Sequence, residues 1–319
     1  MQSTETEEGS NKKQIYGRKA ELVYSLRLLV TNKLVLIGLV ISVGSIVVVL
    51  LSGLLVNPNS WIITNPGAAG ASKLCWSNPV INWYTPNPTN CPAGTPFHPL
   101  GTDFWGRDLL SMIILGLPID LQLSFEIVFS AVIIGVVLGA VAAYAGGIAD
   151  EAILRITDIF FAFPALVLAL VILAVEGRSL TNLALAILVI WWPLYVRLMR
   201  SQILAEKEKT YVEALRSMGA GRFRILFFHI IPNSIYPIFV QATLDIGGVI
   251  LTFSALMFLG FTPNSFLPEL GQLTSDGIAN VRSAPWLVIF PGLTILIVAL
   301  GWNLLGDGVR DVLDPRLRR

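Results

Sequence analysis

The most chemically reactive side chains belong to Cys75 and Cys91, the only two cysteines in the chain. A pair of thiols could bind a metal or form a disulfide. Metal binding is not expected, because no histidine or acidic residue lies between them and His98 alone is a weak zinc signal. A bridge would close a 17-residue segment rich in Pro, Asn and Thr and stabilise it by about 3 kcal/mol. The sequence favours the bridge, with two free thiols as the alternative.

Enzymatic chemistry finds little support elsewhere in the chain. No nucleophile, base and orienting acid have the spacing that a hydrolase would need. His229 resembles a catalytic base only when taken alone, and a hydrogen-bonding role at a bend in the chain fits it better. The phosphate loop G-x-x-x-x-G-K-[ST] is also absent from the sequence. We therefore expect no catalytic residue and no ATP hydrolysis by this chain, and an integral-membrane enzyme is the weaker class.

Composition points to a protein embedded in lipid. Of 319 residues, 54% are hydrophobic and only 13% are charged, whereas soluble domains average roughly 25% charged residues. The net charge of +1 argues against a nucleic-acid partner. An all-α integral membrane protein is predicted.

Six apolar runs are long enough to cross about 30 Å of hydrocarbon as helices. A cleaved signal peptide is the alternative for the first run, but 33 residues precede that run and its apolar core is too long. The runs are residues 34–56, 127–149, 159–175, 179–196, 234–260 and 286–305.

Basic residues predict the orientation, since Lys and Arg remain on the cytoplasmic side. With the N-terminus inside, eighteen Lys and Arg fall in inside segments and four in outside segments. A multi-pass protein of the cell membrane with both termini in the cytoplasm is therefore expected. The predicted order is a cytoplasmic tail (1–33), a first transmembrane helix (34–56), an extracellular loop (57–120) holding both cysteines, a transmembrane core (121–305) and a cytoplasmic tail (306–319).

Asp245 lies inside the fifth apolar run. An ionisable group at bilayer depth costs at least about 2.5 to 3.5 kcal/mol on insertion scales, so it normally faces a partner or a water-filled cavity. Two interpretations remain open. Asp245 could line a path through the membrane, or it could pair with a partner membrane subunit.

The cytoplasmic segment 197–233 has the pattern of two short surface helices. One apolar stripe has helical spacing and a second follows it, while Gly219 and Gly221 allow a tight turn between them. Pro232 ends the pattern before the fifth run. An interfacial anchor is one interpretation; a corner of small residues that enters a groove on another protein is the other. The stripes are Leu204, Tyr211, Leu215 and Met218, then Phe223, Leu226, Phe227 and Ile230.

These residues carry a resemblance to a known family. The run from Glu213 to Gly219, followed by His229 to Asn233, resembles the EAA loop of binding-protein-dependent ABC importer permeases, and more narrowly of the dipeptide/oligopeptide branch. Leu215 departs from the pattern by replacing its second alanine. Further agreement comes, in the family's order, from Gly101–Asp108, from residues 146–164 and from Asn303–Pro315.

The resemblance implies a type I ABC importer permease fold and a division of labour. Such a chain pairs with a second homologous permease as a heterodimer, receives solute from an extracellular binding protein, and is driven by two cytoplasmic ATPases that use ATP and Mg. The permease itself binds no cofactor. The coupling residues implied here are Glu213, Ala214, Gly219, Gly221, His229 and Pro232.

Asp245 and the solute are less determined by the resemblance. Relatives usually carry Gly at the position of Asp245 and Glu at that of Phe253, so the acidic group has shifted along the helix. Peptides are the first expectation for the solute, with oligosaccharides or nickel as alternatives. A secondary carrier or channel is a remoter alternative, because no internal repeat is evident.

Overall fold

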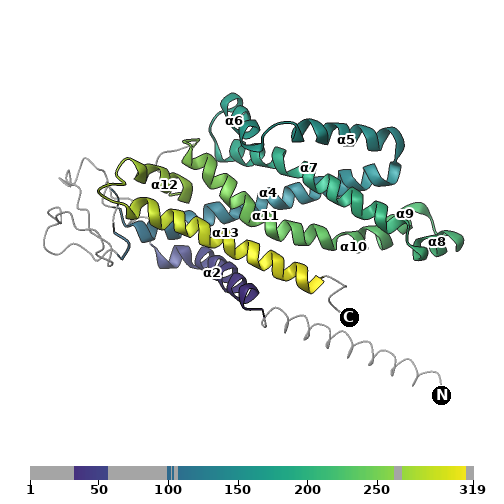
Figure 1. Ribbon diagram of the computed structural model, residues 1–319, viewed down its shortest axis with the longest axis horizontal. Coiled ribbons are helices and arrows are strands. Elements are labelled where there is room, and N and C mark those ends of the chain that lie inside the picture. The colour runs from purple at the N-terminus through teal and green to yellow at the C-terminus, as the bar shows by residue number, and fades with distance from the viewer. Residues whose placement is uncertain (1–31, 57–98, 102, 104–106, 262–267, 314–319) are drawn as a thin grey trace, which may run out of the picture.

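The computed structural model describes residues 32–56, 99–101, 103, 107–261 and 268–313, and all regular structure in these residues is helical (Figure 1). Cys75 and Cys91 lie outside the described residues, so their predicted bridge stays a prediction. The helices in chain order are α2 (Lys33–Leu55), α4 (Leu109–Ala145), α5 (Gly147–Phe161), α6 (Ala165–Glu176), α7 (Leu180–Lys207), α8 (Thr210–Ser217), α9 (Arg222–Ile225), a π-helix (Leu226–Ile230), α10 (Ile231–Ser234), α11 (Tyr236–Phe258), α12 (Leu270–Ile278) and α13 (Trp286–Leu313).

Five of the described helices are long and apolar enough to cross a membrane: α2, α4, α7, α11 and α13. Helices α5 and α6 pass the same test together and make a sixth span if they count as one. The prediction of an all-α membrane protein is therefore confirmed with five to six candidate spans, and the sixth depends on the bent pair.

That span, predicted over 159–175, is broken and bent by 87° between α5 and α6. Pro164 precedes α6 and has no backbone N–H to continue a helix. α5 carries Asp150, Glu151, Arg155 and Asp158 and is amphipathic, whereas α6 is wholly apolar before Glu176. Residues 159–175 form an unbroken hydrophobic run, because hydropathy does not register the break at Pro164.

Three helices extend past the predicted boundaries. α4 begins at Leu109, inside the predicted extracellular loop (57–120), and the Asp108 side chain caps it by accepting from the Ser111 N–H at 2.7 Å. α7 continues to Lys207 and α13 to Leu313. A helix need not end at the membrane surface, so apolar runs alone mark these ends too early.

Close helix packing depends on glycine at two seams. Between α4 and α7, a Cβ added to Gly135 would lie 2.1 Å from Tyr195 Cβ, and one added to Gly139 would lie 2.7 Å from the Val196 carbonyl oxygen. Between α2 and α13, a Cβ on Gly38 would lie 2.6 Å from Leu304 Cβ. Small residues let helix backbones approach where lipid offers no hydrophobic drive for association.

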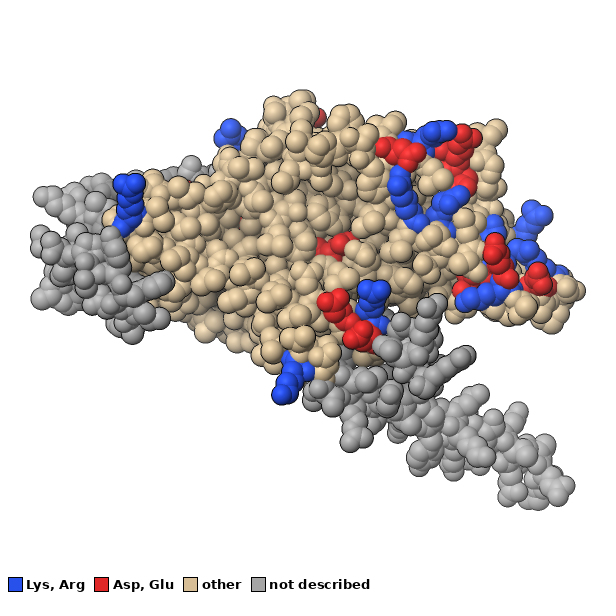
Figure 2. Space-filling model, viewed as in Figure 1, with Lys and Arg blue, Asp and Glu red and all other residues tan. Residues whose placement is uncertain are grey.

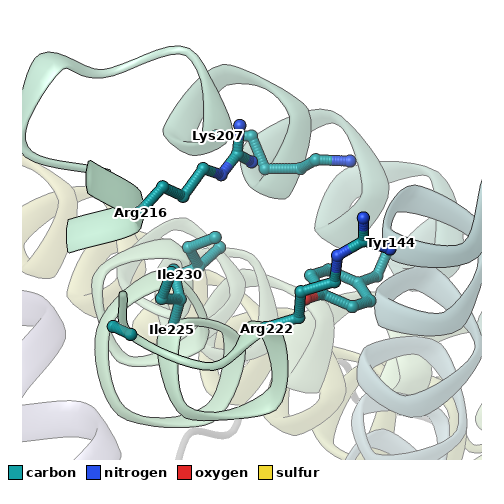
Figure 3. Close-up of a pocket in the computed structure, with 7 residues that line it drawn as sticks. Tyr144, Lys207, Arg216, Arg222, Ile225 and Ile230 are labelled. Atoms are coloured by element: carbon teal, nitrogen blue, oxygen red, sulfur yellow. The ribbon is translucent and has the colours of Figure 1, made fainter. Parts of the chain in front are cut away.

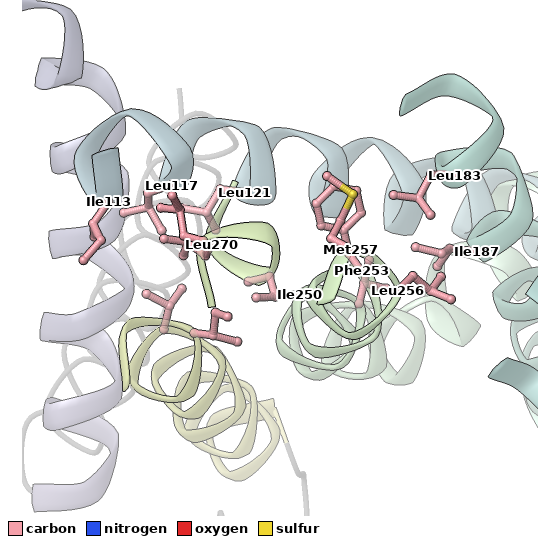
Figure 4. Close-up of a cluster of buried hydrophobic side chains, with 14 of the residues drawn as sticks. Ile113, Leu117, Leu121, Leu183, Ile187, Ile250, Phe253, Leu256, Met257 and Leu270 are labelled. Atoms are coloured by element: carbon pink, nitrogen blue, oxygen red, sulfur yellow. The ribbon is translucent and has the colours of Figure 1, made fainter. Parts of the chain in front are cut away.

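The buried centre joins α4, α7, α11 and α12. Figure 4 shows side chains from these four helices converging, among them Leu117, Phe253 and Leu270. The outer surface is also apolar, with Leu50 and Leu54 of α2 well exposed. Figure 2 shows a nearly uncharged middle and a gathering of charged side chains at the end that carries α8 and α9, as expected for a lipid-facing belt.

Candidate functional site: the corner between α8 and α9

The two surface helices predicted in segment 197–233 are present as α8 and as α9 with the π-helix that follows it, and they meet at a sharp corner. Gly219 has a φ of +79°. Its N–H donates to the Arg216 carbonyl at 3.0 Å, and the Ala220 N–H donates to the Leu215 carbonyl at 3.1 Å. This pair of bonds is a Schellman ending, which requires the left-handed backbone that glycine adopts without strain. The sequence Gly-Ala-Gly therefore ends α8 where it does.

Buried apolar residues attach the corner to the end of α7. Val212 is fully buried and packs in a cluster with Met199 and Ile203 of α7 and with Ile225 and Ile230 beyond the corner. The predicted first stripe is correct for Leu204, Tyr211 and Leu215, which pack against this cluster.

The two predicted stripes are wrong in part. Met218 and Phe223 are 74% and 73% exposed, and Phe227 is exposed as well. Leu226 and Ile230 of the second stripe are buried as predicted. The chain reverses at Gly219, and the five residues from Leu226 to Ile230 form a π-helix, so the spacing of an α-helix does not hold through the corner.

A polar network that sequence analysis missed also positions α8. The buried carboxylate of Glu206 accepts from the Tyr211 hydroxyl at 2.7 Å and pairs with Lys209 at 2.5 Å. Asn233 Nδ2 donates to the Tyr211 hydroxyl at 3.3 Å. Burial and the hydrogen bond to Glu206 raise the pKa of Tyr211, so its hydroxyl keeps its proton and remains a donor. The network thus connects α7, α8 and α10.

A basic pocket of about 430 Å³ opens behind the corner (Figure 3). Lys207, Arg216 and Arg222 contribute the positive charge, and Ile225 and Ile230 form its apolar floor. Lys207 Nζ donates to the Ala143 carbonyl at 2.8 Å and lies 5.7 Å from the centre of the Tyr144 ring, which fixes it against the end of α4.

Two arginine–aspartate pairs fasten α5 to α7 near the same end. Arg200 binds Asp150 through two hydrogen bonds of 2.5 and 2.6 Å. Arg197 pairs with Asp158 and stacks on Phe161 at 4.3 Å. Bidentate arginine–carboxylate contacts define orientation as well as distance, so α5 is held along α7 despite the bend after it.

The structure brings most of the predicted site residues together. Glu213, Ala214, Gly219 and Gly221 are exposed at the corner. His229 is half-buried in the π-helix, and Pro232 is exposed in α10. Asp245 lies apart from them on α11, where its carboxylate accepts from the Tyr195 hydroxyl at 2.6 Å and from Gln241 Nε2 at 2.9 Å.

Residues 135–319, which include the corner, match the family described as binding-protein-dependent transport system inner membrane component. The chain belongs to this family. The matched region of this permease begins in the last third of α4 and includes all of α5 to α13, so it covers both helices of the core and the surface corner.

Curated relatives of this permease match 71% to 99% of its length. It is 38% identical to the dipeptide transport system permease protein DppC of Alkalihalophilus pseudofirmus over 90% of this chain and 87% of that protein. It is 44% identical to DppC of Escherichia coli K12 over 71% and 76% of the two chains. It is 35% identical to the probable D,D-dipeptide transport system permease protein DdpC of the same strain over 99% and 98%.

Proposed function

We propose that this permease is a membrane-spanning subunit of an ATP-driven importer that carries peptides into the cytoplasm. The three relatives described above are named as dipeptide permeases, which favours peptides over oligosaccharides or nickel. A substrate-binding protein outside the membrane delivers the peptide, and a second homologous permease completes the path.

The observation that carries the proposal is the exposed corner between α8 and α9. The large apolar side chains of Met218 and Phe223 are exposed to solvent at the same corner as Glu213. No atom lies within 4 Å of a Cβ added to Gly219, so the backbone there is also accessible. Exposed apolar side chains of this size rimmed by charge mark a surface that another protein covers. A cytoplasmic ATPase is the partner that we assign to it, with one ATPase on each of the two permeases.

The rigid attachment of the corner supports a role in coupling. Val212 and the Glu206–Tyr211–Asn233 network tie α8 to α7 and α10, so a movement imposed on α8 passes directly to helices of the membrane core. ATP and Mg act in the partner subunits, and this chain supplies the mechanical link. The termini and the corner lie on the cytoplasmic side in this assignment.

The test is reconstitution of the permease with its second permease, both ATPases and the binding protein in lipid vesicles. We expect uptake of a labelled dipeptide that requires Mg-ATP and is not displaced by an oligosaccharide or Ni²⁺. Glu213→Lys should insert normally and lose peptide-stimulated ATP hydrolysis together with uptake. Glu176→Lys, which reverses an exposed charge at the far end of α6, is the matched control and should retain both. Uptake without nucleotide would instead indicate a secondary carrier.

A further inference from the structure

Two carboxyl groups meet in the core at the end of the molecule opposite the corner. Asp120 on α4 and Glu269 at the start of α12 are both fully buried. A Cβ added to Gly116, one helical turn before Asp120, would lie 3.5 Å from Glu269 Cα, and the two side chains are close enough to influence each other electrostatically. They are separated by 149 positions in the sequence, and packing of α12 against α4 brings them together. Two charged carboxylates in direct contact inside an apolar core would repel strongly.

The two carboxyl groups have different surroundings. Glu269 caps α12: its Oε1 accepts from the Gly271 N–H at 2.8 Å and its Oε2 from the Gln272 N–H at 2.7 Å. These two bonds favour the ionised form of Glu269. The Leu270 N–H lies near Asp120. Neither carboxylate oxygen of Asp120, however, accepts a hydrogen bond from a donor in the described residues.

A single proton resolves this arrangement. We propose that Asp120 is a carboxylic acid that donates a hydrogen bond to the Glu269 carboxylate, and that this bond holds α12 in its seat between α4, α11 and α13. The charge then rests on the carboxyl group with two backbone donors, and the proton rests on the group that lacks them. The inference concerns the fold of this chain and does not depend on the proposed transport function.

The seat of α12 is tight enough for this bond to matter. A Cβ on Gly116 of α4 would lie 1.9 Å from the Pro268 carbonyl oxygen, and a Cβ on Gly271 would lie 2.2 Å from the Ser254 carbonyl oxygen on α11. A Cβ on Gly277 would lie 2.8 Å from the backbone of Leu287 on α13. α12 is thus fitted against three helices without spare room, and a charge repulsion at its first turn cannot be relieved by a small shift.

Few other ionisable groups surround the pair. α11 faces Glu269 with Ser254, and α13 faces α12 with Leu287. Asp276 on α12 and the ion pair of Arg107 with Asp103 at 2.6 Å border a separate small cavity.

The sign of the pH effect follows from the one proton that the pair shares. Burial, the largest influence on Glu269, raises its pKa and disfavours a second negative charge beside its carboxylate, so the pair keeps this proton above the usual pH range of a carboxyl group. A group with a raised pKa contributes stability while its proton is bound and loses that contribution as the pH rises through the raised value. The pair titrates as a unit. At acidic and neutral pH α12 should therefore stay packed against α4, α11 and α13, and at alkaline pH this packing should loosen.

A buried cysteine on α12 can report this release. We would introduce Leu273→Cys into the full-length chain with Cys75→Ser and Cys91→Ser, in lipid nanodiscs, and measure its alkylation rate at about pH 6 and about pH 9. Asp120→Asn in the same background is the matched control, because its amide donates the same hydrogen bond but has no proton to lose. Dividing the first rate by the second removes the pH dependence of the thiol itself. We expect a ratio near one at the lower pH and a rise of about tenfold at the higher pH, equivalent to one pKa unit.

Infrared spectroscopy provides an independent measurement. The purified chain at neutral pH should show a protonated-carboxyl band that Asp120→Asn removes and Glu126→Gln, on the same helix, retains. In Asp120→Leu the cysteine introduced by Leu273→Cys should be alkylated rapidly at both pH values. If this variant does not fold, the alkylation ratio and the infrared band still test the proposal. A rate ratio that stays near one at both pH values, a band that survives Asp120→Asn, or slow alkylation in Asp120→Leu would overturn the proposal.

Discussion

The Tyr195 hydroxyl donates a hydrogen bond of 2.6 Å to Asp245 Oδ2 and joins the middle of α7 to α11. Gln241 donates to the other carboxylate oxygen at 2.9 Å. Both oxygens of the one acidic residue in α11 therefore have donors within the same chain. An ionisable group at this depth needs such partners, and here tertiary packing supplies them before any partner subunit is considered.

Replacement of Asp245 should separate its structural role from its charge. Asp245→Leu leaves the buried Tyr195 hydroxyl without an acceptor and should lower the free energy of unfolding by about 1–3 kcal/mol. Asp245→Asn keeps an oxygen acceptor and should cost less. Thermal unfolding of the purified variants measures the difference, and equal losses in both would contradict the hydrogen-bond explanation.

The same two variants address a place for Asp245 on the solute path, which we propose alongside its structural role. Asp245→Asn should then slow peptide uptake in the reconstituted importer although its stability is nearly retained. Unchanged uptake would assign Asp245 to packing alone.

Gly219 allows a test of the corner with a closely matched control. Gly219→Val places a β-branched residue at a φ of +79° and should cost about 1–3 kcal/mol of local strain, with loss of ATPase coupling. Gly177→Val imposes the same strain at a φ of +87°, and like Gly219 it is exposed with no atom near an added Cβ. Gly177 lies at the far end of α7, so uptake should survive that substitution. Equal effects on uptake would mean that strain, and not the corner surface, is responsible.

Tyr211 tests the link between the corner and the core. Tyr211→Phe removes the hydroxyl that bonds Glu206 and leaves the buried carboxylate with Lys209 as its partner. Loss of a hydrogen bond to a charged group should cost about 1.5–3 kcal/mol, mostly as faster hydrogen exchange in α8. Phe223→Tyr, which adds a hydroxyl to an exposed ring, should leave exchange in α8 unchanged. If hydrogen exchange in α8 is equally slow in Tyr211→Phe and the parent, the network does not stabilise α8.

The α4–α7 seam predicts a steep cost for one methyl group. Gly135→Ala would force Tyr195 and α7 outward, because the new Cβ would lie 2.1 Å from Tyr195 Cβ; overpacking of this kind costs about 1–3 kcal/mol. Gly53→Ala in α2, where an added Cβ meets nothing within 4 Å, should be neutral or stabilising. Unfolding temperatures of the two variants provide the comparison.

Topology can be tested at two described positions. In a chain with Cys75→Ser and Cys91→Ser, Ser217→Cys should resist an impermeant thiol reagent in intact cells and Ser283→Cys should react, because charge counting places them on opposite sides. Both side chains are exposed, so access differs only by side. Labelling of Ser217→Cys from outside would contradict the orientation.

The sequence alone determined the membrane architecture and the location of the corner. Apolar runs of the right length predict spans whatever their neighbours are, because the cost of exposing a polar backbone or charge to lipid is local. Gly219 likewise indicates the end of α8, since the requirement for a positive φ belongs to a single residue.

Only the tertiary structure decided which residues meet. Tyr195 and Asp245 are 50 positions apart, Tyr211 and Asn233 are 22 apart, and Asp120 and Glu269 are 149 apart. Each of these residues alone reads as an ordinary polar residue or an unexplained buried charge. A hydropathy profile averages over a window of residues, so it does not show how a helix is rotated or which helix faces pack together. The bend of 87° after α5 and the proton assigned to Asp120 both depend on that packing, which is why they emerge from the fold and not from the pattern.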